Sequence, residues 1–156
     1  MTGQGKSMFV KKYIKEKRCY VFDVQNEYTD LQINPYAERG RDVNLDEKKF
    51  IESCLNRKKT ICVFEEATGF FEGKLDKKVR HLVLSKRHTG NIFIFCFHSI
   101  SSVPPRLMQL TNFVILFKTG DEDYQVKSKF PSLYDYYSRL KKLPSHSSFN
   151  IKTIPQ

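Results

Sequence analysis

Long apolar runs are absent from this sequence: it has no stretch of 18 apolar residues, and its first residues lack the apolar segment of a secretory signal. We therefore expect a soluble, cytoplasmic protein without a membrane span. The sequence also has no C-x-x-C pair, no internal repeat and no low-complexity segment. Its four cysteines lie mostly in apolar segments and are expected to be reduced packing residues of a cytosolic protein: Cys19, Cys54, Cys62 and Cys96.

The composition is that of a folded domain with an excess of positive charge. Of the 156 residues, 40% are apolar and 13% are aromatic, which argues against a disordered chain and favours one compact domain. The formal net charge of +10 predicts attraction to polyanions. Nucleic acid, nucleotide phosphates and an acidic membrane surface all fit this charge.

Helical and strand patterns alternate along the chain. Helical spacing predicts helices over 7–17, 44–56, 74–87, 105–110 and 132–143, and apolar β-rich runs predict strands over 19–24, 60–64, 91–97 and 113–117. Asn44 followed by Glu47 resembles a capping box for the second helix. This alternation is typical of an α/β fold with right-handed crossovers. We expect a core over 1–120, and over 121–156 a helical extension with a loose tail from Pro144.

The first residues carry the second half of a phosphate-binding loop. Gly3-Gln4-Gly5-Lys6-Ser7 directly precedes a stretch with the spacing of an amphipathic helix. In such a loop, backbone N–H groups surround the β-phosphate, the lysine contacts the β and γ oxygens, and the hydroxyl binds Mg²⁺. The full pattern has another glycine five residues before Gly5, ahead of Met1. These residues alone fit an ordinary flexible terminus equally well.

Two carboxylates follow a buried strand in the middle of the chain. Glu65 and Glu66 come directly after the apolar run 61–64, at the strand end where open α/β sheets bind their ligands. Glu65 can hold the Mg²⁺ shell, and Glu66 can orient and deprotonate the attacking water. An isolated Glu-Glu pair is commonly a solvated loop. Its position one strand and one helix after the Gly-Lys-Ser turn favours the catalytic interpretation.

Further motifs follow in a recognisable order up to about residue 118. They are Met1–Ser7, Phe22–Tyr28 with Asp23 and Glu27, Phe64–Glu66, Arg87-His88 before the strand 92–97, and Val103–Arg106 before 112–118. This series resembles the P-loop ATPases of the HerA/FtsK superfamily, which contains DNA translocases and many viral genome-packaging ATPases. Because several motifs occur in sequence, the resemblance is much more specific than the loop alone.

The resemblance implies a P-loop NTPase (RecA-like) fold, a three-layer α/β/α arrangement with a mostly parallel sheet, and Mg²⁺-dependent ATP hydrolysis that drives DNA translocation or genome packaging. The implied ATP-binding residues are Thr2, Gly3, Gln4, Gly5, Lys6, Ser7 and Met8, and the implied Mg²⁺ ligands are Ser7 and Glu65. The implied catalytic residues are Glu66, Lys6, His98, Arg87 and Arg106. Double-stranded DNA, a homo-oligomer such as a hexameric ring, and phage capsid or assembly proteins are the implied partners, in the cytoplasm or in association with virions.

Some of these roles have simpler alternatives. His98 stands where the family usually ends its sensor strand with glutamine; a neutral imidazole can bind a γ-phosphate or the attacking water, but a loop histidine without a ligand is an equally good interpretation. Arg87 and Arg106 are candidates for an arginine that reaches a neighbouring subunit's γ-phosphate, although a surface cation is the more common role. Asp23 and Glu27 could face the nucleotide or DNA side of the sheet, but a cap of the strand end and its turn is the simpler interpretation.

The resemblance also predicts a missing first strand, because the family's first strand would precede Met1. We therefore expect an N-terminally shortened form of a longer ATPase. That strand normally lies between the sensor strand and the final strand, so 92–97 and 113–117 would either face each other across a gap or pair directly. An unpaired apolar strand edge would promote aggregation.

Three functions remain open at this point. The first is an ATPase that moves or packages double-stranded DNA, with lysines of the first helix and of the C-terminal segment contacting phosphates. The second is a nucleic-acid-binding or virion-assembly module that keeps the fold without turnover. The third is a small phosphotransferase such as a nucleotide kinase, which would normally need an arginine-rich lid that the sequence does not show.

Overall fold

The computed structural model describes residues 5–23, 25, 27–28, 37–39, 46–72 and 75–153. The chain divides into two compact units, one formed by Ser7–Phe97 and the other by His98–Gln156 together with Met1–Lys6. These bounds differ from the division expected at residue 120, because the strand at 113–117 pairs with a strand near the C-terminus.

The unit Ser7–Phe97 contains a four-stranded parallel sheet with the order β2-β1-β3-β4. Its strands are β1 Cys19–Phe22, β2 Ala37–Arg39, β3 Ile61–Phe64 and β4 Ile92–Phe95. The helices are α1 Lys6–Ile14, α2 Glu47–Leu55, α3 Leu75–Leu84, α4 Lys86–Thr89 and the 3₁₀ helix η2 Ala67–Phe71. The predicted α/β class with a parallel sheet is confirmed.

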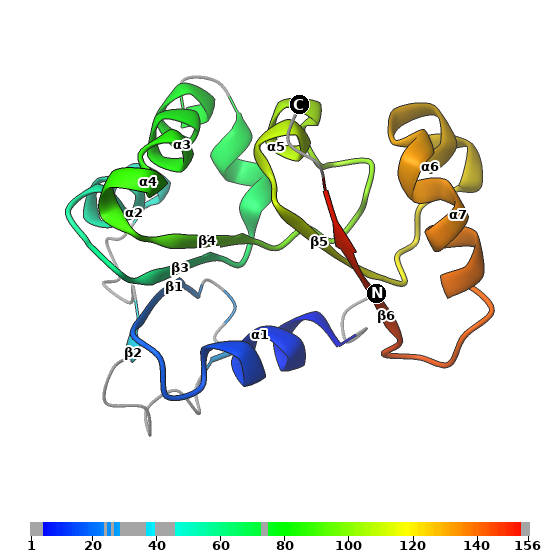
Figure 1. Cartoon of the computed structure of the whole chain (residues 1–156), viewed down its shortest axis with the longest axis horizontal. Helices are drawn as coiled ribbons and strands as arrows, with labels where there is room; N and C mark the ends of the chain where they lie inside the picture. The colour runs from blue at the N-terminus through cyan, green and yellow to red at the C-terminus, as the bar shows by residue number, and fades with distance from the viewer. Residues whose placement is uncertain are drawn as a thin grey trace. The chain divides into compact units, whose positions relative to one another are not determined.

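Helices cover both faces of this sheet (Figure 1). Alternate residues of β1 and β3 point to opposite faces. Val10 and Ile14 of α1 join one core cluster with Cys19, Val21 and Val63. On the other face, Phe50 of α2 packs against aromatic rings of the strands and of η2: Tyr20, Phe22, Phe64 and Phe70. Strands β1 and β3 are therefore buried on both faces and read as continuous apolar runs.

The unit that holds His98–Gln156 is built around an antiparallel pair of strands. Its elements are α5 Pro105–Leu110, β5 Phe113–Phe117, α6 Asp123–Lys129, α7 Pro131–Leu140 and β6 Ser148–Lys152. The loose tail expected beyond Pro144 is wrong, because β6 pairs with β5 along its whole length. Strands β4 and β5 belong to different sheets.

Several helix boundaries differ from the expected ones. The N-cap of α2 is Asp46, whose side chain accepts a hydrogen bond from the Lys49 N–H, and not Asn44, which lies outside the described residues. The helix expected over 74–87 is two helices, α3 and α4, and α6 was not expected at all. Helix α6 has a capping box formed by Glu122 and Gln125.

All four cysteines are free and buried, as expected for packing residues. Hydrogen bonding to Cys62 and burial raise the pKa of the Cys54 thiol, so this group stays protonated. Within the described ranges, no helix combines the length and the apolarity that a membrane span requires.

Candidate active site

The first turn of α1 brings a hydroxyl to the carboxyl-terminal edge of the parallel sheet. The Ser7 hydroxyl donates a hydrogen bond to the carboxylate of Glu27, and its oxygen lies 3.3 Å from Oε1 of Glu65. Glu65 directly follows β3, and Glu27 belongs to the segment after β1. Ser7 and Glu65, the two residues predicted to bind Mg²⁺, therefore lie in contact.

A tight turn after β1 places Glu27 there. The buried carboxylate of Asp23 accepts hydrogen bonds from two backbone N–H groups, that of Glu27 at 2.8 Å and that of Tyr28 at 3.2 Å. Asp23 thus caps the strand end, in agreement with its simpler interpretation. Glu27 does more than take part in that turn, because its side chain reaches Ser7.

A buried tyrosine holds Glu65 in place. The Tyr28 hydroxyl donates a hydrogen bond of 2.5 Å to Oε2 of Glu65, and both residues are buried. Burial, followed by the negative charge of Glu65, raises the pKa of Tyr28 well above its usual range, so the phenol stays a proton donor. A buried carboxylate needs such donors to remain charged. One oxygen of Glu65 is thus fixed by Tyr28, and the other faces Ser7.

The predicted catalytic base lies beside this group. Glu66 is half-buried at the start of η2, and its Oε1 accepts a hydrogen bond of 2.8 Å from the Gln25 side chain. Gln25 belongs to the same segment after β1 that provides Glu27. The segment therefore supports both acids that follow β3.

In the other unit, Lys6 and His98 lie in contact. The Lys6 ammonium is 3.1 Å from Nδ1 of His98. An ammonium group can only donate, so Nδ1 is the acceptor and the ring proton is on Nε2. Gly5, the residue before Lys6, has a φ of +94°, a conformation that favours glycine. Added at Gly5, a Cβ would lie 3.3 Å from the His146 ring.

The other predicted site residues are not part of these contacts. Thr2, Gly3 and Gln4 lie outside the described residues. Met8 is 69% exposed. Arg87 is exposed on α4, which precedes β4 and therefore lies at the edge of the sheet opposite to Glu65 and Glu66. Arg106 is exposed in the first turn of α5.

The groups around Ser7 suit a small hard cation. Its hydroxyl and the carboxylates of Glu27 and Glu65 are oxygen donors, which Mg²⁺ prefers, and Mg²⁺ sites commonly use only one or two carboxylates. Within the part of the chain that the structure describes, no group of three or more His, Cys, Asp or Glu side chains could hold a metal ion. The protein groups would therefore supply only part of the coordination.

The segment after β1 contributes more to the site than its sequence indicated. Asp23, Glu27 and Tyr28 were expected to form a motif, and Asp23 and Glu27 to face the nucleotide or DNA side of the sheet or to cap the strand end, but none was predicted as a site residue. The available signal was the spacing from Asp23 to Glu27 and Tyr28. It allows Asp23 to bind the N–H groups of both later residues.

Comparison with solved structures identifies the fold. No protein-family model and no curated protein sequence matches the chain. The structure is similar to that of the genome packaging NTPase B204 from Sulfolobus turreted icosahedral virus 2 in complex with ATP-gammaS, with a TM-score of 0.71, 14% identity, and coverage of 97% of this chain and 88% of that chain. With the same NTPase bound to AMPPCP, the TM-score is 0.67 and the identity 18%, over 98% of this chain and 94% of that one. The chain thus has the fold of a P-loop NTPase.

Proposed function

We propose that this protein is a Mg²⁺-dependent ATPase of the HerA/FtsK type that drives DNA translocation or genome packaging. The contact between Ser7 and Glu65 supports this most strongly, because it joins the Gly-Lys-Ser turn to the acidic end of β3. These two features are far apart in the sequence and are needed together for phosphoryl transfer. The similarity in fold to a genome packaging NTPase agrees with this proposal.

Each residue has a defined task in the proposed reaction. Ser7 and Glu65 would hold Mg²⁺, which neutralises the negative charge that develops on the phosphate oxygens. Lys6 would contact the β and γ oxygens of ATP, and backbone N–H groups around Gly5 would surround the β-phosphate. Glu66 would accept a proton from the water that attacks the γ-phosphorus, while the bond to the leaving oxygen of ADP breaks.

Further residues would sense or complete the site. His98 would donate from Nε2 to the γ-phosphate or to the attacking water, because Nδ1 accepts from Lys6. Arg87 lies at the edge of the sheet opposite to Glu66, so it would act on the site of a neighbouring subunit in a ring. Arg106 is the second candidate for that role. Double-stranded DNA and capsid or assembly proteins would be the partners, and the protein would be cytoplasmic or virion-associated.

Two substitutions test the assigned roles. Lys6→Ala should abolish ATP binding, while Glu66→Gln should leave binding intact and reduce hydrolysis by roughly 100-fold or more. Binding of a fluorescent ATP analogue and phosphate release measure the two properties separately. Glu52→Gln, which removes one exposed acid from α2, is the matched control and should change neither. Equal loss of ATP binding in both test variants would contradict the roles given to Lys6 and Glu66.

Adding DNA to the hydrolysis assay distinguishes the candidate functions. Hydrolysis that rises with double-stranded DNA supports a translocase or packaging ATPase. DNA binding without hydrolysis would instead indicate an assembly module, and transfer of phosphate to a nucleotide would indicate a kinase.

A further inference from the structure

A second charged surface lies at the amino-terminal edge of the parallel sheet, opposite the carboxylates of the candidate active site. Strands β1 and β3 begin side by side, with Cys19 paired with Ile61. The segments just before the strands carry a group of cations that we call the basic edge: Lys15, Lys17 and Arg18 before β1, Arg57, Lys58 and Lys59 before β3, and Lys86 before β4. Arg87, which follows Lys86, keeps its proposed role toward a neighbouring subunit and is not part of this group.

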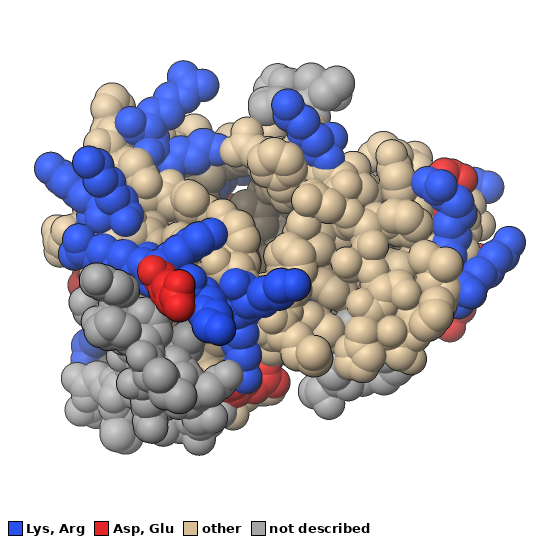
Figure 2. All heavy atoms as spheres, turned by 60° about the horizontal axis from the view of Figure 1, so that its bottom comes forward, with Lys and Arg blue, Asp and Glu red and all other residues tan. Residues whose placement is uncertain are grey.

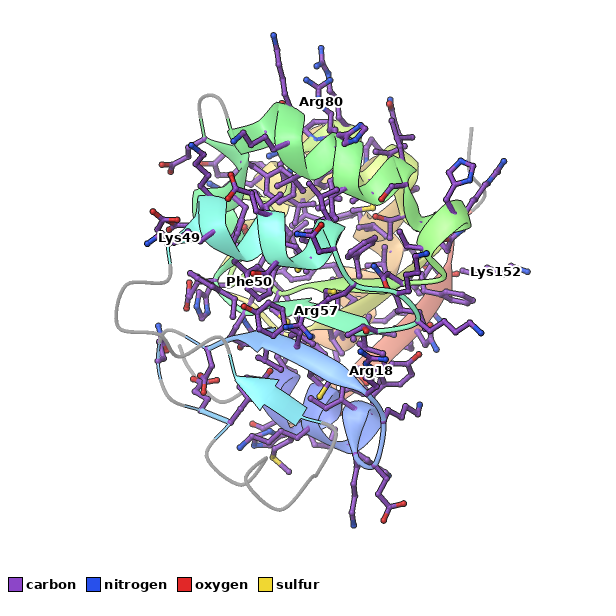
Figure 3. All side chains as sticks on the ribbon, turned by 90° about the vertical axis from the view of Figure 1, so that its left-hand side faces the viewer. Arg18, Lys49, Phe50, Arg57, Arg80 and Lys152 are labelled. Carbon is purple, nitrogen blue, oxygen red and sulfur yellow. The ribbon has the colours of Figure 1, made fainter. Side chains whose placement is uncertain are left out.

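An open pocket of about 520 Å³ lies within this edge. It is lined by Arg18, Ser53, Asn56, Arg57 and Lys58. Each of these five side chains can donate a hydrogen bond, three of them carry a positive charge, and none is a carboxylate. Figure 3 shows Arg18 and Arg57 at this edge, away from Lys49 near the start of α2. Such a set of donors matches the oxygens of a phosphate group.

The fold fixes the backbone of Arg18 and the guanidinium of Arg57 in the lining of the pocket. The carbonyl of Arg18 accepts a hydrogen bond from the N–H of Ile61, which fixes it beside β3. The guanidinium of Arg57 lies 3.9 Å from the centre of the Tyr20 ring. A guanidinium held by packing, as that of Arg57 is, loses less conformational freedom on binding an anion than a free surface lysine does.

A buried amide anchors the segment before β3, which contains Arg57 and Lys58. Asn91 donates hydrogen bonds to the carbonyls of Cys54 and Arg57, and its oxygen accepts one from the N–H of Thr60. The carbonyls at the end of α2 are thereby bound inside the protein. The pocket therefore presents side-chain donors and cations to a ligand.

Cations lie over two aromatic rings at this edge. Lys17 lies over the ring of Tyr13, and Arg57 lies over the ring of Tyr20, which is buried. The groups that line the pocket are hydrogen-bond donors and cations, which bind phosphate oxygens. Recognition here would therefore use phosphate contacts, and these carry no sequence information.

We propose that the basic edge binds the phosphodiester backbone of double-stranded DNA, with a phosphate in the pocket formed by Arg18, Arg57 and Lys58. Neighbouring strands of a sheet are about 4.8 Å apart, so the cations before β1, β3 and β4 form a row. DNA offers a row of charges of its own, one for about every 1.7 Å of helix axis. Figure 2 shows Lys and Arg side chains gathered on the unit that contains this sheet, with few acidic side chains between them. The inference deepens the proposed function by naming the surface for its polymer.

The test compares two variants that remove the same charge. Arg18→Gln/Lys58→Gln changes the pocket, whereas Lys48→Gln/Lys77→Gln changes exposed residues near the starts of α2 and α3, at the other end of these helices. Fluorescence anisotropy of a labelled duplex of about 30 base pairs, measured between about 50 and 200 mM salt, gives the affinity and its salt dependence. The full chain is used, and thermal melting verifies that each variant is folded.

We expect the pocket variant to bind the duplex roughly tenfold or more weakly than the unchanged protein does. The negative slope of log K against log salt should become less steep by about two, because two phosphate contacts disappear. The control variant should bind nearly as the unchanged protein does. Equal loss in the two variants would overturn the proposal in favour of a simple net-charge effect, and so would no loss in either. Loss of binding to polyglutamate with DNA binding unchanged would indicate an acidic protein partner instead.

The same samples separate this inference from the proposed ATPase function. Hydrolysis in the absence of DNA should be unchanged in the pocket variant, because neither substituted residue belongs to the candidate active site. A chain that binds DNA through the pocket but hydrolyses no ATP would contradict the proposed function alone. A chain whose DNA-stimulated hydrolysis is unaffected by the pocket variant would contradict this inference alone.

Discussion

The two edges of the parallel sheet in Ser7–Phe97 carry opposite charge. At the carboxyl-terminal edge, the segments after β1 and β3 carry Asp23, Glu27, Glu65 and Glu66, and each accepts a hydrogen bond. At the amino-terminal edge, the segments before β1, β3 and β4 carry the cations of the basic edge, with Glu16 as the one acid in the stretches 15–18, 57–59 and 86–88. One sheet therefore presents two surfaces with different chemistry.

The directions of the helices explain why the charges separate in this way. Helix α1 begins at the carboxyl-terminal edge, where the partial positive charge of its N-terminus favours carboxylates and phosphates. Helix α2 runs back and ends at the amino-terminal edge, where its partial negative charge favours Arg57 and Lys58. In a parallel sheet, each crossover helix begins at the carboxyl-terminal edge and ends at the amino-terminal edge. The two edges therefore receive opposite ends of the helices.

The largest effect on stability is expected from breaking the anchor of the basic edge. Asn91→Ala leaves the carbonyl of Arg57 and the N–H of Thr60 without their partner in the protein interior, which should cost about 3 kcal/mol of unfolding free energy. Urea denaturation measures this change. Gln109→Ala, an exposed position of α5, is the control and should be nearly neutral. An Asn91→Ala protein as stable as the control would show that the edge does not depend on this amide.

A smaller effect is expected at the carboxyl-terminal edge of the sheet, which we call the acidic edge because it carries Asp23, Glu27, Glu65 and Glu66. Tyr28→Phe removes the hydrogen bond to the buried carboxylate of Glu65 and should lower the unfolding free energy by about 2 kcal/mol. ATP hydrolysis should fall as well, because Glu65 loses the donor that orients it. Tyr124→Phe is the matched control, since the Tyr124 side chain is 71% exposed. If both variants unfold at the same urea concentration, Tyr28 does not stabilise Glu65.

The smallest effect concerns the turn that leads into α1. Gly5→Ala places a side chain where φ is +94° and should cost about 1 kcal/mol, with weaker ATP binding because Lys6 and Ser7 follow directly. Gly120→Ala is a suitable control, since a Cβ there would meet no atom within 4 Å. Melting temperatures and ATP titrations compare the two. Unchanged ATP binding in Gly5→Ala would show that the acidic edge works without this turn.

Much of the parallel sheet was predictable because its strands are continuous apolar runs bounded by charged residues. The runs at 19–24, 60–64 and 91–97 contain β1, β3 and β4, and the run at 113–117 coincides with β5. The short strand β2 and the C-terminal strand β6 were not expected. β6 alternates exposed and half-buried residues and depends on pairing with β5, a partner that a local pattern does not reveal.

The sequence predicted which residues approach one another at the acidic edge better than it predicted what supports them. It placed the Gly-Lys-Ser turn before a helix and Glu65-Glu66 after a buried strand, and the structure brings Ser7 to Glu65. It did not assign Tyr28 and Gln25 to the site, because their partners are Glu65 and Glu66, about 40 residues later in the chain. The roles of Lys6, Glu66, His98, Arg87 and Arg106 in ATP hydrolysis remain predictions.

The sequence by itself determined the alternation of helix and strand, the burial of the central strands and the strand end at which the paired acids lie, because each depends on neighbours within a few residues. The tertiary structure alone decided that segments before three separate strands meet in one basic edge, that Tyr28 holds Glu65, and that the C-terminal residues pair with β5. Charge composition is the same in every arrangement of the chain. Only the parallel pairing of β1, β3 and β4 separates that charge into an acidic edge and a basic one.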